Sequence, residues 1–368
     1  MRAKAENERI FTVEIGKLRV MSNQMREQMH QHIINWVDES PFLEDDGSIT
    51  SGLSLTMVLP TKGCKYAMAD HGGCSMCTLP MDNPLNPTDE AIHSLPERTW
   101  ELFNQKGGAQ KFRGVKFYTS GSYLDRWELP VDTQKAILAK FVDHVDEITI
   151  ETRCEYVLRT HLEDILEVVP ASKLIVAIGQ ETTDDEINKR SVNKGHKYRQ
   201  FKRAVELLHS YGIKSKGYIL LKSIFMSELS ALDDVLRTAK HMHDLGVKNI
   251  SINPCYIGKK TLMEQMFYQG TYRPPWLWTV YYATIAVKQL VGDSVRVISD
   301  PVAAGSDRGP RNCGVCDKSI KSHLKQFSAT QDISILDDLT CGCQSVYHAA
   351  LNTEHLANGM GTTEIFYH

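Results

Sequence analysis

The chain of 368 residues is 42% hydrophobic and 24% charged, proportions that exclude a disordered or fibrous protein and allow one large core or two ordinary ones. Its formal net charge of -3 and its pI near 6.5 exclude a basic field that attracts nucleic acid by charge alone. No apolar run has the length of a signal peptide or a membrane span, so a cytoplasmic protein without membrane contact is expected.

Residues 1–50 are expected to form an N-terminal extension. A β-rich run over residues 10–16 predicts a short strand. The spacing of apolar residues over 25–37 predicts an amphipathic helix, which ends in an acidic loop.

Strand-like and helical segments alternate from residue 51 onward. The strand-like runs are residues 53–60, 114–120, 147–153, 173–179, 213–221 and 247–254. Helical patterns lie at residues 133–145, 155–169, 198–212 and 231–246, with a further helix at 271–291 and a further strand at 295–301. This alternation predicts an α/β fold, a partial (β/α)6 barrel over residues 51–300, with its chemistry on the loops at the carboxyl ends of the strands.

Three cysteines, Cys64, Cys74 and Cys77, directly follow the first strand-like run with the spacing C-x9-C-x2-C. Three thiolates on one loop can bind three irons of a [4Fe–4S] cube and leave the fourth iron open for a ligand. The alternative is a zinc knuckle completed by His71, because zinc prefers four nitrogen or sulfur ligands. Placement at the first β/α loop of a barrel favours the cluster.

Polar residues and one glycine lie at the ends of the next three strands of the predicted barrel. In chain order they are Ser120, Gly121, Ser122, Glu151, Arg153, Gln180 and Glu181. Core packing does not easily explain polar side chains at consecutive strand ends, so a polar ligand site is expected there. A rim ion pair between Glu151 and Arg153 and an ordinary turn at residues 120–122 are the alternatives.

A second cysteine group lies in the C-terminal segment, residues 301–368. It consists of a C-x2-C pair and a C-x-C pair, Cys313, Cys316, Cys341 and Cys343. Two close pairs of thiolates predict a closed tetrahedral zinc site that fastens this segment over the barrel mouth. An auxiliary [4Fe–4S] cluster also accepts four cysteines, and unliganded thiols are the third alternative.

Four further residues are candidates for substrate chemistry. Lys216, Tyr218 and Lys222 alternate along the fifth barrel strand and so share one face, which lines the cavity if it points inward. The two cations suit a substrate that carries a carboxylate. Cys255 follows the sixth strand and is interpreted as core or cavity lining, with substrate contact or hydrogen donation as the alternative.

Six segments in order over residues 50–345 resemble one branch of the radical S-adenosylmethionine (SAM) enzymes. They are TKGCKYAMADHGGCSMC, YTSGSYLDRWELP, IETRCEYV, IGQETTDDEINKRSVNKGHKYRQF, KGYILLKSIFMSE and AGSDRGPRNCGVCD. The branch includes the elongator catalytic subunit and the archaeosine synthase radical SAM subunit, and the chain resembles the second more closely. The resemblance covers the whole catalytic chain rather than a lone motif.

The resemblance implies a role for each of the polar residues. Cys64, Cys74 and Cys77 would ligate the [4Fe–4S] cluster, and residues 120–122 would hold the methionine end of SAM. Glu151 and Arg153 would line the SAM pocket, with Gln180 and Glu181 on the ribose side. Such an enzyme reduces SAM to a 5′-deoxyadenosyl radical, and the cofactors rather than the protein side chains carry out this reductive cleavage.

The substrate implied is tRNA carrying a 7-deazaguanine base to which a separate synthase subunit has attached lysine. Cleavage of the lysine C–N bond then leaves archaeosine. The implied partners are this tRNA, the lysine-transferring archaeosine synthase subunit and a reductant protein. A radical SAM enzyme acting on a small metabolite or peptide is the first alternative, and a zinc-stabilised binding module without catalysis is the second.

Overall fold

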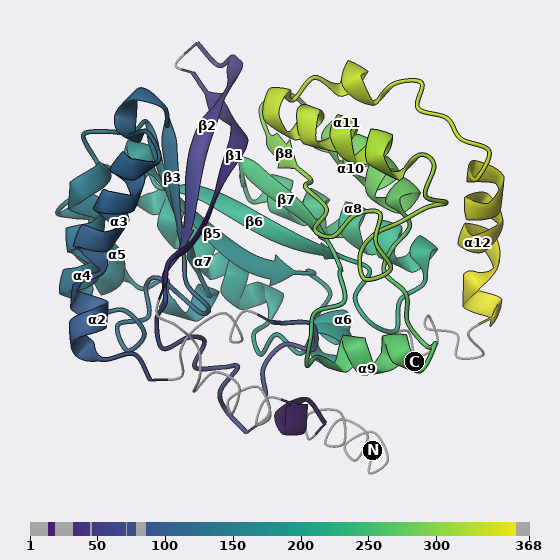
Figure 1. Ribbon diagram of the computed structural model, residues 1–368, viewed down its shortest axis with the longest axis horizontal. Coiled ribbons are helices and arrows are strands. Elements are labelled where there is room, and N and C mark those ends of the chain that lie inside the picture. The colour runs from purple at the N-terminus through teal and green to yellow at the C-terminus, as the bar shows by residue number, and fades with distance from the viewer. Residues whose placement is uncertain (1–13, 19–31, 45, 71, 79–85, 358–368) are drawn as a thin grey trace.

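One eight-stranded sheet forms the centre of the molecule in the computed structural model, which describes residues 14–18, 32–44, 46–70, 72–78 and 86–357. The strands lie in the sheet in their chain order, with the first antiparallel to the second and the other neighbours parallel. Helices flank the sheet on both sides in Figure 1. The predicted parallel α/β barrel is therefore confirmed.

The strands are β1 (Ile34–Leu43), β2 (Ile49–Val58), β3 (Gly114–Tyr118), β4 (Glu147–Thr152), β5 (Leu174–Glu181), β6 (Lys214–Leu221), β7 (Asn249–Pro254) and β8 (Arg296–Ile298). The helices are α2 (Asp89–His93), α3 (Leu95–Gln105), α4 (Val131–Phe141), α5 (Arg159–Leu166), α6 (Asp185–Ile187), α7 (Tyr198–Ser210), α8 (Glu228–Asp244), α9 (Leu262–Tyr268), α10 (Leu277–Val291), α11 (Asp317–Thr330) and α12 (Gln344–Ala357). A π-helical turn, η5 (Asn188–Val192), precedes α7.

The barrel core follows from the burial pattern of its strands and helices. All eight residues of β5 are buried, as expected for a parallel strand covered on both faces. Helix α7 buries Phe201, Ala204, Val205 and Leu208, a spacing that places these side chains on one face toward the sheet.

The barrel is nearly closed between its first and last strands. Arg296 at the start of β8 donates a hydrogen bond of 2.8 Å to the carbonyl oxygen of Pro41 in β1. The same guanidinium lies 2.9 Å from the Glu147 carboxylate at the start of β4. Helix α11 packs against β1, β2 and β8, so it covers the remaining gap.

The N-terminal segment differs from its predicted strand and its predicted helix where the structure describes them. Residues 14–18 are helical, whereas a strand was predicted over 10–16. Residues 34–37 belong to β1, whereas a helix was predicted over 25–37, and the remainder of both predictions lies outside the described residues. All ten residues of β1 pair with β2, and this tertiary pairing overrides the local helical spacing.

Part of the predicted N-terminal extension therefore belongs to the barrel sheet, as strand β1. The domain boundaries at residues 50 and 300 stay predictions. Among the described helices, none is long and apolar enough to cross a membrane.

Candidate functional site at the carboxyl end of the barrel

The first cysteine loop begins where β2 ends, at the carboxyl end of the barrel. Cys64 and Cys74 are buried and Cys77 is half-buried. Gly73 has a φ of 78°, and a Cβ there would lie 2.6 Å from the Cα of Ala67, so the loop folds tightly on itself. Burial raises the pKa of the Cys64 thiol to about 11, while the charge of Arg153 opposes this rise. His71 lies outside the described residues.

The segment that follows β5 clamps the cysteine loop from one side. Asn193 donates a hydrogen bond of 2.7 Å to the carbonyl oxygen of Gly73, and the Ser75 hydroxyl donates one of 2.6 Å to the carbonyl oxygen of Ser191. The Tyr66 hydroxyl lies 2.9 Å from the carbonyl oxygen of Asn193. Because the clamp starts in the π-helical turn η5, that irregular turn is part of the site's framework.

Glu128, a residue that the sequence did not single out, holds the loop from the other side. Its carboxylate accepts hydrogen bonds of 2.6 Å from the Thr61 hydroxyl and from the backbone N–H of Ser122. Burial raises the pKa of Glu128 to about 7, although these hydrogen bonds oppose the shift. One buried carboxyl group therefore joins the start of the cysteine loop to the small-residue turn after β3.

Gly121 in this turn has no room for a side chain. A Cβ there would lie 2.6 Å from the Cα of Cys64 and would also meet the Glu128 carboxylate. We expect Gly121→Ala to displace the cysteine loop, at a cost of about 1–3 kcal/mol for overpacking. After anaerobic reconstitution the variant should lose most of its bound iron, measured as iron per protein.

Gly47→Ala is the matched control for this substitution. Gly47 has a positive φ of 82°, which Gly121 does not share, and a Cβ there meets nothing within 4 Å. It therefore tests backbone strain without crowding the loop. Equal iron contents in the Gly121 and Gly47 variants would contradict the expected crowding.

The ends of β3 and β4 are tied together beside the loop. The backbone N–H of Arg153 donates a hydrogen bond of 3.0 Å to the Ser122 hydroxyl, and Tyr123 N–H donates one of 2.8 Å to the carbonyl oxygen of Glu151. The Arg153 guanidinium lies 4.4 Å from the ring centroid of Tyr66, in the cysteine loop. The structure thus brings residues 120–122 and Arg153 to the cysteine loop.

Gln180 and Glu181 diverge because the register of β5 shifts between Gly179 and Glu181. Glu181, with a φ of 68°, forms an ion pair of 2.8 Å with Lys194. The Gln180 amide instead contacts His196 at 3.1 Å, so the two side chains do not line one surface.

Glu151 lies near the Glu181–Lys194 pair. Burial raises the pKa of Glu151 to about 7, and the Lys194 charge opposes this. Lys194 was not predicted from the sequence as a site residue. The feature of the sequence that could have pointed to it is its position in a basic run, residues 194–203.

A family model described as the Radical SAM superfamily matches residues 58–233. Archaeosine synthase subunit beta of Methanosarcina acetivorans is 34% identical over 310 residues, 83% of this chain and 87% of that protein. Archaeosine synthase subunit beta of Thermococcus kodakarensis is 37% identical over 305 residues, 82% of this chain and 92% of that protein. The chain belongs to the radical SAM superfamily.

These identities confirm the predicted resemblance to the archaeosine synthase radical SAM subunit. Among solved structures, the archaeal Methanocaldococcus infernus Elp3 with an N-terminal deletion is similar with a TM-score of 0.48 and 15% identity. That match covers 64% of this chain and 59% of the other.

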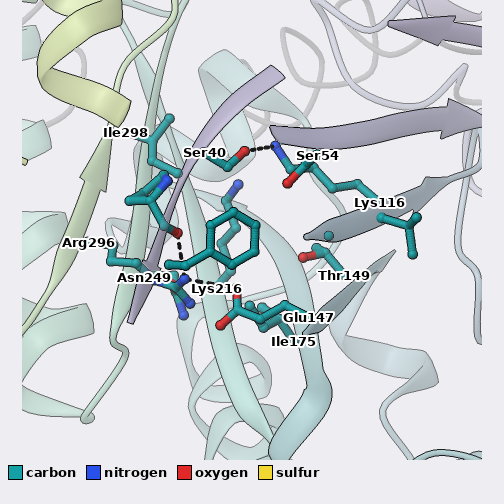
Figure 2. A pocket seen from close by; sticks show the side chains of 14 residues that line it. Ser40, Ser54, Lys116, Glu147, Thr149, Ile175, Lys216, Asn249, Arg296 and Ile298 are labelled. Atoms are coloured by element: carbon teal, nitrogen blue, oxygen red, sulfur yellow. Dashed lines mark hydrogen bonds and ion pairs between the residues drawn. The ribbon is translucent and has the colours of Figure 1, made fainter. Parts of the chain in front are cut away.

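Lys216 lies toward the amino end of the radical SAM barrel, away from the cysteine loop. It lines a cavity of about 30 Å³, large enough for an ordered water molecule, together with Glu147, Asn249 and Arg296 at the starts of their strands (Figure 2). Burial and the charge of Lys116 lower the pKa of Lys216 to about 7.

Tyr218 lies farther along the same face of β6. Its hydroxyl is 3.3 Å from that of Tyr118, and burial together with the nearby Tyr118 and Glu151 side chains raises the pKa of Tyr218. Tyr218 and Glu151 therefore meet in the middle of the barrel.

Lys222 does not continue the alternation, because β6 ends at Leu221 and Lys222 has a left-handed φ of 61°. Its fully buried ammonium lies 2.6 Å from the Glu228 carboxylate and 2.8 Å from that of Glu354 in α12. The expectation that one strand face carries all three candidates is therefore wrong at this position. Cys255 is buried in an apolar cluster with Ile257.

Lys222→Ala is expected to destabilise the protein by about 3–5 kcal/mol, because it leaves the buried Glu228 carboxylate without its cation. Thermal unfolding of the cluster-free protein measures this cost. Glu354→Gln is the matched control, since Glu354 is partly exposed and should cost less. A stable Lys222→Ala protein that cleaves SAM without modifying substrate would instead favour the predicted catalytic role.

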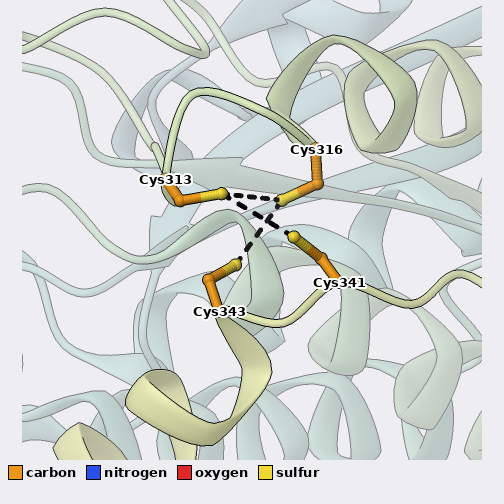
Figure 3. A group of neighbouring side chains, drawn as sticks. All are labelled: Cys313, Cys316, Cys341 and Cys343. Carbon is orange, nitrogen blue, oxygen red and sulfur yellow. Dashed lines mark hydrogen bonds between the residues drawn. The ribbon is translucent and has the colours of Figure 1, made fainter.

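The four C-terminal cysteines converge on one point (Figure 3). Their sulfurs lie 3.9 Å apart for Cys313 and Cys316, and 3.7 Å apart both for Cys313 and Cys341 and for Cys316 and Cys343. A tetrahedral ion with metal–sulfur bonds of about 2.3 Å needs sulfurs about 3.8 Å apart. The group can therefore hold a single metal ion.

Donors around these sulfurs favour the thiolate form. The Trp278 indole N–H lies 3.2 Å from the sulfur of Cys343, and the Asn312 amide lies 3.3 Å from that of Cys316. Backbone hydrogen bonds from Cys316 and Val315 lower the pKa of Cys313 to about 7, whereas burial raises the pKa of Cys316 and of Cys343 although these donors oppose the rise. Such outer contacts orient ligands and stabilise their ligating form.

Proposed function

We propose that this radical SAM enzyme is the subunit of an archaeosine synthase that breaks the lysine C–N bond of a modified 7-deazaguanine in tRNA. The observation that carries the proposal is the 37% identity to an archaeosine synthase subunit beta over 92% of that protein. Radical chemistry supports the proposal. The C–H bonds next to the lysine C–N bond are not acidic, so a base cannot start the cleavage, whereas a radical can remove a hydrogen atom there.

The residues at the carboxyl end of the barrel fit a [4Fe–4S] cluster and SAM. Three cysteines share one loop, and Gly121 gives that loop a cradle which a single Cβ would fill. When bound, the cluster would supply the electron that cleaves SAM to a 5′-deoxyadenosyl radical. We assign residues 120–122 and Arg153 to binding the methionine end of SAM, and Glu181 to binding its ribose. Gln180 would position neighbouring residues rather than contact SAM itself.

Among the predicted catalytic residues, Tyr218 is the best placed to face the substrate. It meets Glu151 in the middle of the barrel, and Lys194 and Glu181 add a cation and an anion nearby. A lysine adduct carries one amino and one carboxylate group, so it suits paired charges of both signs. Lys216, Lys222 and Cys255 would then support the barrel around the substrate.

The partners follow from the substrate. The relatives are named as subunits, so a lysine-transferring partner subunit is proposed, together with tRNA, a reductant protein and a cytoplasmic location. We assign zinc to the C-terminal cysteines, because sulfurs 3.7 Å apart fit one ion, whereas a cube places each thiolate on a different iron.

The test supplies the reconstituted enzyme with SAM, dithionite and tRNA that carries the lysine adduct. Nuclease digestion and mass spectrometry should detect archaeosine in step with 5′-deoxyadenosine. Transfer RNA carrying the same base without lysine is the control and should yield no archaeosine. Formation of 5′-deoxyadenosine with intact lysine adduct would reject this substrate while leaving the radical SAM assignment in place.

A further inference from the structure

Three metal-ligating side chains meet outside both cysteine groups already described. A ligand atom from each of Cys154, Glu155 and His196 lies within 4.8 Å of the other two. Cys154 and Glu155 lie in the 3-10 turn that follows β4, and His196 lies on the short connection between η5 and α7. Cys154 and His196 are buried, whereas the Glu155 side chain is 35% exposed and gives access from solvent.

Gln180 fixes the orientation of His196. The Gln180 amide nitrogen donates a hydrogen bond of 2.7 Å to the carbonyl oxygen of Thr182, which turns the amide oxygen toward His196. That oxygen lies 3.1 Å from Nε2 of His196 and can only accept, so Nε2 carries the proton. The lone pair of His196 is therefore on Nδ1.

Nδ1 of His196 is a buried atom without a hydrogen-bond partner, and the side chain is 1% exposed. It faces Oε2 of Glu155 at 3.9 Å, so a lone pair points at a carboxylate oxygen. A buried polar atom of this kind is costly unless something binds between the two groups. An imidazole that donates through one nitrogen and presents the other is the usual arrangement of a metal ligand.

The third donor has a matching distance. The Cys154 thiol donates a hydrogen bond of 3.7 Å to the same Oε2 of Glu155, and a bound ion would take the place of that proton. Bonds of about 2.0–2.3 Å to oxygen, nitrogen and sulfur place tetrahedral ligands about 3.3–3.6 Å apart. Small shifts would bring Oε2 into this range of both partners, and the sulfur–nitrogen distance, which is within 4.8 Å, would shorten as well. The other carboxylate oxygen of Glu155 is held by Arg153 at 2.5 Å, which leaves Oε2 for an ion.

We propose that Cys154, Glu155 and His196 form a third metal site, which binds a zinc-like divalent transition metal ion. The mixture of sulfur, nitrogen and oxygen donors suits zinc rather than calcium or magnesium. Three protein ligands leave the fourth position for water or a substrate donor, on the exposed side of Glu155. Arg153 and Lys194 add positive charge nearby, so affinity is expected to be lower than at the four-cysteine group.

The test counts zinc in the full-length, cluster-reconstituted protein equilibrated with buffered free Zn²⁺. The wild-type protein should bind one more ion than either Cys154→Ala or His196→Gln. Cys255→Ala is the matched control, because it removes another buried thiol outside the site and should bind as many ions as the wild type. Gln180→Leu keeps all three ligands and should weaken this ion by about 10–100-fold.

Equal zinc contents in the wild type, Cys154→Ala and His196→Gln would overturn the proposal, as would loss of the same ion in Cys255→Ala. If both ligand variants fail to fold, anomalous diffraction at the zinc edge decides on wild-type crystals grown with Zn²⁺. An anomalous peak beside Nδ1 of His196 supports the site, and its absence there rejects it.

Discussion

Cys74→Ala is expected to reduce 5′-deoxyadenosine formation by at least about 10³-fold, because the iron–sulfur cluster supplies the electron for SAM cleavage. Cys74 is buried in the loop that Asn193 clamps through Gly73, so contacts from outside the loop hold it in place. The measurement is chromatography of 5′-deoxyadenosine after anaerobic reconstitution and dithionite reduction.

Asp70→Ala is the matched control for Cys74→Ala. Asp70 lies on the same loop but is exposed, so its removal should change neither iron content nor SAM cleavage. Iron analysis separates the two ways in which Cys74→Ala can lose activity. Iron loss indicates that the cluster is not held, and a full cluster without cleavage indicates that its open iron is misplaced. Wild-type cleavage by the Cys74 variant would contradict its role as a ligand.

The barrel could be predicted from the sequence because its parallel strands are covered on both faces. A run such as LIVAIG in β5 is apolar throughout, and it is separated from its neighbours by amphipathic helical segments such as α7. Strand β1 could not be predicted in this way. Its two faces differ little in polarity, and only pairing with β2 fixes its structure.

The two cysteine groups could be recognised in the sequence because close spacing in the chain is itself the signal. Contacts between distant residues leave no such signal. Glu128 reaches back to Thr61, and Lys222 pairs with Glu354, 132 residues later in the chain. The divergence of Gln180 and Glu181 follows from a bulge in β5, and alternation along the sequence does not reveal a bulge.

Cys316→Ser is expected to abolish binding of the metal ion proposed for the C-terminal cysteines and to destabilise this segment by about 4 kcal/mol or more. Cys316 is buried at the N-terminal end of α11, and this helix packs Ile320, Leu324 and Phe327 into the barrel core. Without the ion, one buried sulfur position becomes a polar hydroxyl, and three thiolates lose their shared counter-charge. Zinc content and hydrogen exchange along α11 measure the two effects.

Val315→Ala is the control for Cys316→Ser, because Val315 lies inside the same C-x2-C pair and is 84% exposed. It should keep both the ion and the slow exchange of α11. If Cys316→Ser also kept both, the four thiols would not be a structural metal site. Iron in place of zinc in the wild-type protein would instead favour the auxiliary cluster.

Cys316→Ser should also disturb the contacts that helix α12 makes at the barrel mouth. Cys341 and Cys343 directly precede this helix, whose Glu354 binds both Lys222 and the backbone N–H of Glu228. A loosened α12 would leave the buried Lys222 with one carboxylate partner instead of two. We therefore expect Cys316→Ser to lower 5′-deoxyadenosine formation less than Cys74→Ala does, since the electron source remains. An equal loss in the two variants would indicate that the C-terminal metal takes part in electron transfer.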